Sequence, residues 1–159
     1  MPKALIVYYS RSGNTKAIAE DIAAAVTQEG LAVDLRSVEK VQPAELSNYQ
    51  LIICGGPTYY GGAPYQIKQL LDETVKFHGQ LDGKVGGAFC SSANIAGGNE
   101  TTLFSILNAF LIHGMIIQGD PRGDHYGPVA INAPDDRCRS GCRRYGQRLA
   151  RLTKQLFGD

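Results

Sequence analysis

The chain has 159 residues, 43% of them hydrophobic, and a formal net charge of +1. This length predicts a single domain over residues 1–159 with a full hydrophobic core. The sequence contains no run of 18 apolar residues, which predicts no membrane span, and we expect a cytoplasmic protein because an apolar strand begins almost at the first residue. Few aromatic residues interleave with the arginines, so nucleic acid is not expected as a partner.

Apolar runs alternate with amphipathic stretches along the whole chain. We expect strands at residues 4–9, 32–38, 50–55, 84–90 and 115–118, and helices at 15–29, 64–75, 100–113 and 139–157. The alternation predicts an α/β fold with a five-stranded, doubly wound parallel sheet of order 2-1-3-4-5 and helices on both faces. The loops after strands 1, 3 and 4 then converge at one sheet edge, where this class of sheet binds ligands.

The loop after the first strand is rich in hydroxyl groups and leads directly into a helix. Its residues are Ser10, Arg11, Ser12, Gly13, Asn14 and Thr15. Free backbone N–H groups, a helix dipole and three hydroxyls can bind a phosphate without a lysine. An ordinary helix cap explains this loop equally well when it is taken alone. The spacing of a Walker loop and the Gly-x-Gly-x-x-Gly fingerprint are both missing, which favours a monophosphate.

The next two loops at this edge also carry unusual residues. After strand 3 the chain has two adjacent tyrosines among glycines, and after strand 4 it has a loop rich in backbone donors. Tyrosine offers a stacking face, and glycine allows close approach to a flat ligand. Although each loop could be a plain surface connection, together they predict a flat ligand that bears a phosphate. The candidate residues are Pro57, Thr58, Tyr59, Tyr60, Gly61, Ser91, Ser92, Ala93, Asn94, Gly97 and Gly98.

Two features near the C-terminus have open interpretations. Cys138 and Cys142 lie four residues apart, and we favour a plain helix surface over zinc, which would need two more ligands, or over a redox pair. From residue 137 onward, six arginines and one lysine stand against a single aspartate. We interpret this run as a solvated helix face, with a nucleotide phosphate or an acidic partner as alternatives.

Several motifs, in order, resemble the flavodoxin-like family and, within it, the WrbA-type NAD(P)H:quinone oxidoreductases. The loop from Ser10 to Thr15 is similar to the phosphate loop that binds flavin mononucleotide (FMN) in flavodoxins. The Pro-Thr-Tyr-Tyr-Gly run at 57–61, the Gly-Gly-Asn-Glu-Thr-Thr run at 97–102 and the His-Gly-Met run at 113–115 resemble WrbA-type segments. The resemblance implies bound FMN, NAD(P)H as electron donor, a quinone-like acceptor and a catalytic role for His113 beside the flavin. A capping role at a helix end is the alternative for His113.

The resemblance leaves two functional classes open. The first is an oxidoreductase that passes two electrons from NAD(P)H to a quinone. The second is a flavodoxin-type carrier that exchanges electrons with redox partner proteins. A third loop without aromatic or acidic residues before Glu100, and a pI near 7.7, favour the oxidoreductase. WrbA-type members assemble as tetramers, so the resemblance also implies a homo-dimer or homo-tetramer. This chain departs from them because it is shorter and lacks the insertion after strand 2 that helps to build their tetramer. A flavin-sensing module without turnover is a minor alternative.

Overall fold

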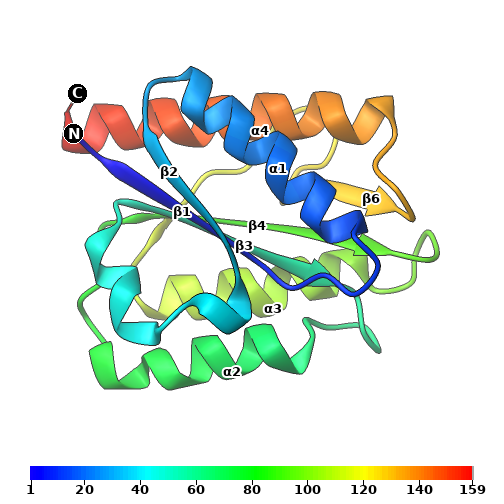
Figure 1. Cartoon of the computed structure of the whole chain (residues 1–159), viewed down its shortest axis with the longest axis horizontal. Helices are drawn as coiled ribbons and strands as arrows, with labels where there is room; N and C mark the ends of the chain where they lie inside the picture. The colour runs from blue at the N-terminus through cyan, green and yellow to red at the C-terminus, as the bar shows by residue number, and fades with distance from the viewer. Residues whose placement is uncertain (159) are drawn as a thin grey trace.

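The computed structural model describes residues 1–158 and contains one parallel sheet (Figure 1). The strands are β1 (Lys3–Tyr8), β2 (Ala32–Ser37), β3 (Leu51–Pro57), β4 (Val85–Ser92), β5 (Ile116–Ile117) and β6 (Val129–Ile131). The order β2-β1-β3-β4-β5 confirms the predicted 2-1-3-4-5 arrangement. One strand was not predicted: β6 pairs with the far end of β4, beyond the point where the two-residue β5 stops.

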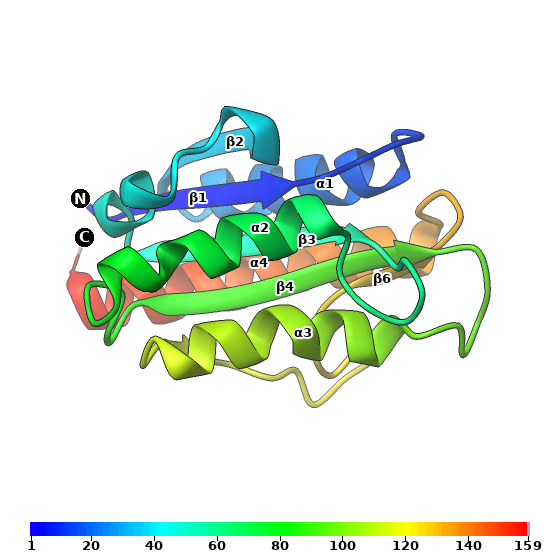
Figure 2. The same ribbon diagram turned by 90° about the horizontal axis from the view of Figure 1, so that it is seen from below.

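The sheet lies between two layers of helices, as the alternating sequence predicts (Figures 1 and 2). On one face lie α1 (Asn14–Gln28) and α4 (Asp136–Phe157), and on the other lie α2 (Tyr65–Glu73) and α3 (Asn99–Ile112). Short 3-10 helices cover Val38–Lys40, Pro43–Asn48 and Thr74–Phe77. The last of these replaces the end of the helix expected at 64–75. No helix among residues 1–158 is both long enough and apolar enough to cross a membrane.

Strand β4 has glycines at the positions where large side chains from the helices pack against the sheet. A Cβ at Gly86 would lie 2.9 Å from the Phe110 ring, and a Cβ at Gly87 would lie 2.6 Å from the Tyr145 hydroxyl and 2.7 Å from Leu149. Real Cβ atoms do not approach other atoms so closely in packed interiors. The glycines in β4 therefore allow both helix layers to pack directly on the sheet.

The outer edge of β4 is completed partly by a side chain. Gly86 pairs with β5 and Cys90 pairs with β6, which leaves Ala88 between the two short strands. There the buried Tyr145 hydroxyl accepts a hydrogen bond from the Ala88 N–H at 3.0 Å. Because a buried N–H without a partner is costly, Tyr145 stands in for the missing strand.

The two cysteines of α4 are buried, so the prediction of a plain helix surface was wrong. Cys138 and Cys142 are both 0% exposed, and their Sγ atoms are 3.9 Å apart in the core shared with α1. The helix begins at Asp136, three residues earlier than expected, with Asp135 accepting a hydrogen bond from the Cys138 N–H at 2.8 Å. This earlier start places both thiols on the same inner face as Tyr145.

The arginines of α4 are not simply solvated, which corrects the interpretation of the basic run. Arg139 pairs with Asp21 at 2.7 Å, and Arg151 pairs with Glu29 at 2.8 Å, so both attach α4 to the neighbouring α1. The Arg151 guanidinium lowers the pKa of Glu29. Other arginines of the run, Arg137, Arg144 and Arg148, contact the segment between β5 and β6.

Candidate functional site

Three loops meet at the carboxyl ends of β1, β3 and β4 and enclose a hollow of about 420 Å³. This is the sheet edge at which the sequence predicts a ligand. The hollow is lined by Arg11, Ser12, Asn14, Thr15, Pro57, Thr58, Tyr59, Ser91, Ser92, Ala93 and Asn132. Ten of these eleven residues are among the candidates named from the sequence.

The first loop ends in a helix start that has no side-chain cap. Gly13 is the N-cap residue of α1 in a left-handed conformation (φ +99°), and its N–H donates to the Ser10 Oγ at 3.0 Å. The first turn of the helix contains no acidic residue. The first-turn N–H groups of a helix have no partner within the helix, and the helix dipole gives this end a partial positive charge. This end of α1 can therefore receive an anion.

Hydroxyl groups connect the three loops. The buried Thr15 and Ser91 hydroxyls are 2.7 Å apart, which links the first loop to the third. The Thr58 N–H donates to the Ser91 carbonyl at 2.7 Å, which links the second loop to the third. Thr102, on the first turn of α3, donates its hydroxyl to the Thr58 Oγ1 at 2.9 Å. The three loops that form the walls of the hollow are thus held in place by hydrogen bonds to one another.

The second loop supplies an aromatic wall. Tyr59 lines the hollow and packs edge-on against Tyr9, with ring centroids 6.4 Å apart. An antiparallel bridge between Tyr59 and Gly62 closes the turn that follows. The next residue, Tyr60, has a left-handed backbone (φ +49°) and a fully exposed side chain. A flat ligand can therefore stack on Tyr59 but meets Tyr60 only at the rim.

Seven of the predicted residues shape the loops without lining the hollow. Gly61 and Gly98 bring the second and third loops together, since a Cβ on Gly98 would lie 2.5 Å from the Gly61 Cα. The seven residues are Ser10, Gly13, Tyr60, Gly61, Asn94, Gly97 and Gly98.

One residue that lines the hollow was not predicted from the sequence. This is Asn132, which follows β6 and donates its N–H to the Ser92 carbonyl at 2.7 Å.

His113 lies at the other end of α3 from these loops and does not line the hollow, so its predicted role beside a flavin stays a prediction. It is the C-cap residue of α3, a helix of 14 residues that begins next to the third loop. At 1.5 Å per residue, the helix carries His113 about 21 Å away, to the opposite sheet end. His113 is therefore not among the residues that line the hollow of the three loops. Its position agrees with the alternative interpretation, a histidine at the C-terminal end of a helix.

The surroundings of His113 are those of a buried, neutral histidine. Its Nε2 is 2.8 Å from the Thr74 Oγ1, and its ring lies 5.7 Å from the His78 ring between centroids. Burial, together with the neighbouring His78, lowers the pKa of His113. The residue lines a separate hollow between α2 and α3.

Comparison with known proteins gives a consistent result. The flavodoxin domain family matches residues 5–111. An NAD(P)H dehydrogenase (quinone) of Azorhizobium caulinodans is 32% identical over 199 aligned residues, covering 99% of this chain and 100% of the relative. A flavodoxin of Clostridium saccharobutylicum is 33% identical over 162 residues, covering 98% and 99%. A crystal structure of a WrbA-like flavodoxin from Agrobacterium tumefaciens is 27% identical, covers 98% of this chain and 99% of its own, and has a TM-score of 0.83.

Strand order and the convergence of the three loops define a doubly wound α/β protein of flavodoxin-like architecture. The family match is more specific, and the chain belongs to the flavodoxin family. Membership of this family identifies a flavin-binding redox protein, either an oxidoreductase or an electron carrier.

Proposed function

We propose that the chain is an FMN-dependent oxidoreductase that passes two electrons from NAD(P)H to a quinone-like acceptor. The observation that carries the cofactor assignment is the uncapped N-terminus of α1 opening into a hollow with an aromatic wall. A flavin mononucleotide has both groups that such a site would receive, a phosphate and a flat ring.

The phosphate end of the hollow has unused donors. Thr15 and Ser91 share one hydrogen bond, so one of their two hydroxyl protons remains without an acceptor among the described residues. Arg11 adds a cation that has no ion pair within residues 1–158. These groups and the first-turn N–H groups of α1 would together hold a phosphate.

The ring end is uncharged. Tyr59 and Thr58 would flank the flavin on one side, with the backbone of Ser92 and Ala93 on the other. When bound, the flavin would supply the electron-transfer chemistry, and the chain would hold it and exclude water. None of the described residues that line the hollow is acidic, so the surroundings do not oppose the negative charge that arrives with two electrons. This favours two-electron over one-electron chemistry.

The identity of the electron donor and acceptor rests on relatives. The relative from Azorhizobium caulinodans carries the name of an NAD(P)H dehydrogenase for quinones and is covered completely. The flavodoxin of Clostridium saccharobutylicum is equally similar and closer to this chain in length, since its alignment spans 162 rather than 199 residues. A carrier reduced by a partner protein is therefore the second candidate.

One experiment separates the two candidates. The FMN-loaded protein is mixed with NADH or NADPH without oxygen, and the flavin absorbance is followed. Direct bleaching, reversed by adding a quinone, is the expected result for the oxidoreductase. Flavin that stays oxidised with both nucleotides, yet bleaches with a flavodoxin reductase, would identify a carrier and refute the proposed activity.

A matched pair of variants tests the cofactor site. Thr15→Val removes the hydroxyl that contacts Ser91, whereas Thr27→Val removes a hydroxyl of the same helix that bonds only to the Ala23 carbonyl. We expect FMN to bind about tenfold more weakly to Thr15→Val, the effect of one lost hydrogen bond to a charged group, and unchanged to Thr27→Val. Equal affinities for both variants would argue against phosphate binding at this loop.

The assembly as a homo-dimer or homo-tetramer and the cytoplasmic location stay predictions.

A further inference from the structure

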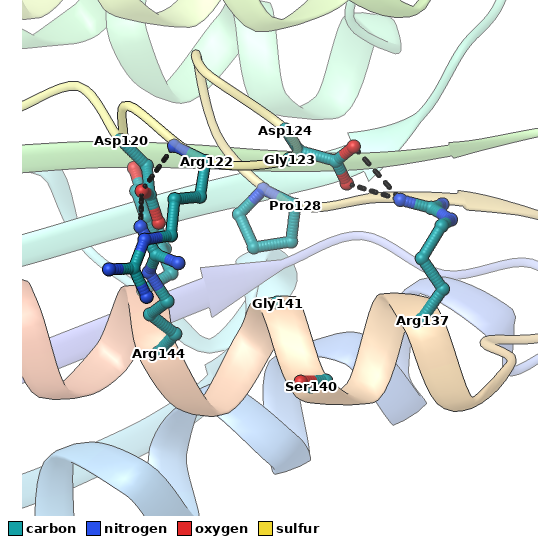
Figure 3. A pocket seen from close by; sticks show the side chains of 10 residues that line it. Asp120, Arg122, Gly123, Asp124, Pro128, Arg137, Ser140, Gly141 and Arg144 are labelled. Carbon is teal, nitrogen blue, oxygen red and sulfur yellow. Dashed lines mark hydrogen bonds and ion pairs between the residues drawn. The ribbon is translucent and has the colours of Figure 1, made fainter.

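A second hollow, of about 360 Å³, lies between α4 and the segment that joins β5 to β6 (Figure 3). Its charged residues are three arginines and two aspartates. None of them lines the proposed flavin site. The family resemblance and the proposed function give this hollow no role.

Part of the charge at this hollow is structural. The Nη1 of Arg137 donates to both carboxylate oxygens of Asp124, at 2.9 and 3.0 Å, and its Nη2 donates to the Val129 carbonyl at 2.8 Å. The Asp124 carboxylate also accepts from the Val129 N–H at 2.9 Å. These bonds fix the start of β6 to α4 and occupy most of the donors of Arg137. The pair of Arg137 and Asp124 therefore has a structural role, and no ligand is needed to explain it.

The other end of the hollow has excess positive charge. The guanidinium groups of Arg122 and Arg144 both lie on the side of the Asp120 carboxylate that faces α4 (Figure 3). Asp120 is buried and pairs with Arg144, while its Oδ1 also accepts the Arg122 backbone N–H at 2.9 Å. The Arg122 guanidinium makes no hydrogen bond or ion pair within residues 1–158. One carboxylate thus faces two guanidiniums, and the donors of Arg122 are available.

A glycine on α4 leaves space in the same hollow. Gly141 lies in the interior of the helix, where glycine costs roughly 1 kcal/mol relative to alanine. On the same helix, Gly146 is explained by packing, because a Cβ there would lie 2.8 Å from Ala25. A Cβ on Gly141 would have no neighbour within 4 Å, so packing does not require a glycine at this position. In Figure 3, Gly141 faces Pro128 across the hollow. These two residues form an uncharged part of its lining beside the arginines.

From these observations we propose that this hollow binds a phosphomonoester of a small organic molecule. Arg122 and Arg144 would hold the phosphate, since planar guanidiniums match its oxygens with paired hydrogen bonds. The organic part would occupy the space between Gly141 and Pro128. A free phosphate would use only the arginine end and bind more weakly. The proposal does not depend on the flavin, whose phosphate would sit at the other site.

The test uses the FMN-loaded protein, so that the phosphate loop of α1 is filled. Ribose 5-phosphate, inorganic phosphate and ribose are titrated separately, and amide shifts of Gly123 and Gly141 are followed by NMR. We expect saturable shifts with ribose 5-phosphate, weaker binding of inorganic phosphate and no response to ribose. Inorganic phosphate that binds as tightly as the ester would refute the organic part of the proposal. No saturable shift with either phosphate would refute all of it.

Three variants sharpen the result. Arg122→Ser removes a guanidinium without any bond within the chain, and we expect binding to weaken at least about tenfold. Gly141→Leu fills the hollow and improves helix propensity, so it should abolish binding of ribose 5-phosphate while the fold remains intact. Arg143→Ser, an exposed arginine of the same helix outside the hollow, is the control and should bind normally. Equal losses in Arg122→Ser and Arg143→Ser would indicate attraction to the overall charge of α4 and overturn the proposal.

Discussion

The contact between the second and third loops gives a sharp test of how the proposed flavin site is held open. Gly98 has φ +110°, and an alanine Cβ there would lie 2.5 Å from the Gly61 Cα. Gly79 also has a positive φ, +88°, but a Cβ there meets nothing within 4 Å. Gly98→Ala and Gly79→Ala therefore both carry a conformational penalty, of at least about 1–2 kcal/mol. Only Gly98→Ala also forces two backbone segments apart.

We expect the two variants to differ in both stability and cofactor affinity. Urea unfolding should place Gly79→Ala about 1–2 kcal/mol below the parent and Gly98→Ala lower still. FMN affinity, measured by quenching of flavin fluorescence, should fall at least about tenfold in Gly98→Ala, which corresponds to about 1.4 kcal/mol. Gly79→Ala should bind FMN normally. If Gly98→Ala matched the control in both measurements, the two loops would not depend on each other for their positions.

Three further outcomes follow from individual contacts. Tyr145→Phe should lower the free energy of unfolding by about 1–3 kcal/mol in urea, because the Ala88 N–H is then buried without an acceptor; no change would mean that another group replaces it. Arg139→Ala should cost less than about 1 kcal/mol, since its pair with Asp21 is partly exposed, and added salt should shrink the difference. The native state lowers the pKa of His113, so the unfolded chain takes up its proton first, and stability should fall as the pH drops below about 6.5. Urea midpoints of the parent and His113→Gln between pH 7 and 5 check this, and parallel curves would contradict it.

The central part of the fold was predictable because its sequence signal is strong. Strands β1, β3 and β4 are covered on both faces, so they appear in the sequence as continuous apolar runs. The loop at residues 10–15 stood out for a different reason, although its binding of a phosphate stays a prediction. A cluster of hydroxyls and a glycine between a buried strand and a helix matches few roles other than a helix cap or an anion site.

His113 shows what a motif resemblance does not provide, which is a position in space. The three residues 113–115 resemble a segment near the flavin in WrbA-type proteins, but resemblance gives no position in space. The sequence did contain the necessary signal, because the predicted helix at 100–113 begins at the third loop. A residue at its far end lies about 20 Å from its start. Helix length, considered first, predicts that His113 and the three loops of the same chain lie at opposite ends of α3.

The position of Asn132 could not be predicted because it depends on tertiary contacts. β6 has only three residues, too few for a periodic pattern, and it is held by pairing with β4 and by the contacts of Asp124 with Val129. Arg137 secures the same segment from α4. These bonds come from three separate parts of the chain, and together they carry Asn132 to the Ser92 carbonyl at the hollow. Arg137 of α4 thus helps to position one wall of the proposed flavin site, although it does not line the hollow itself.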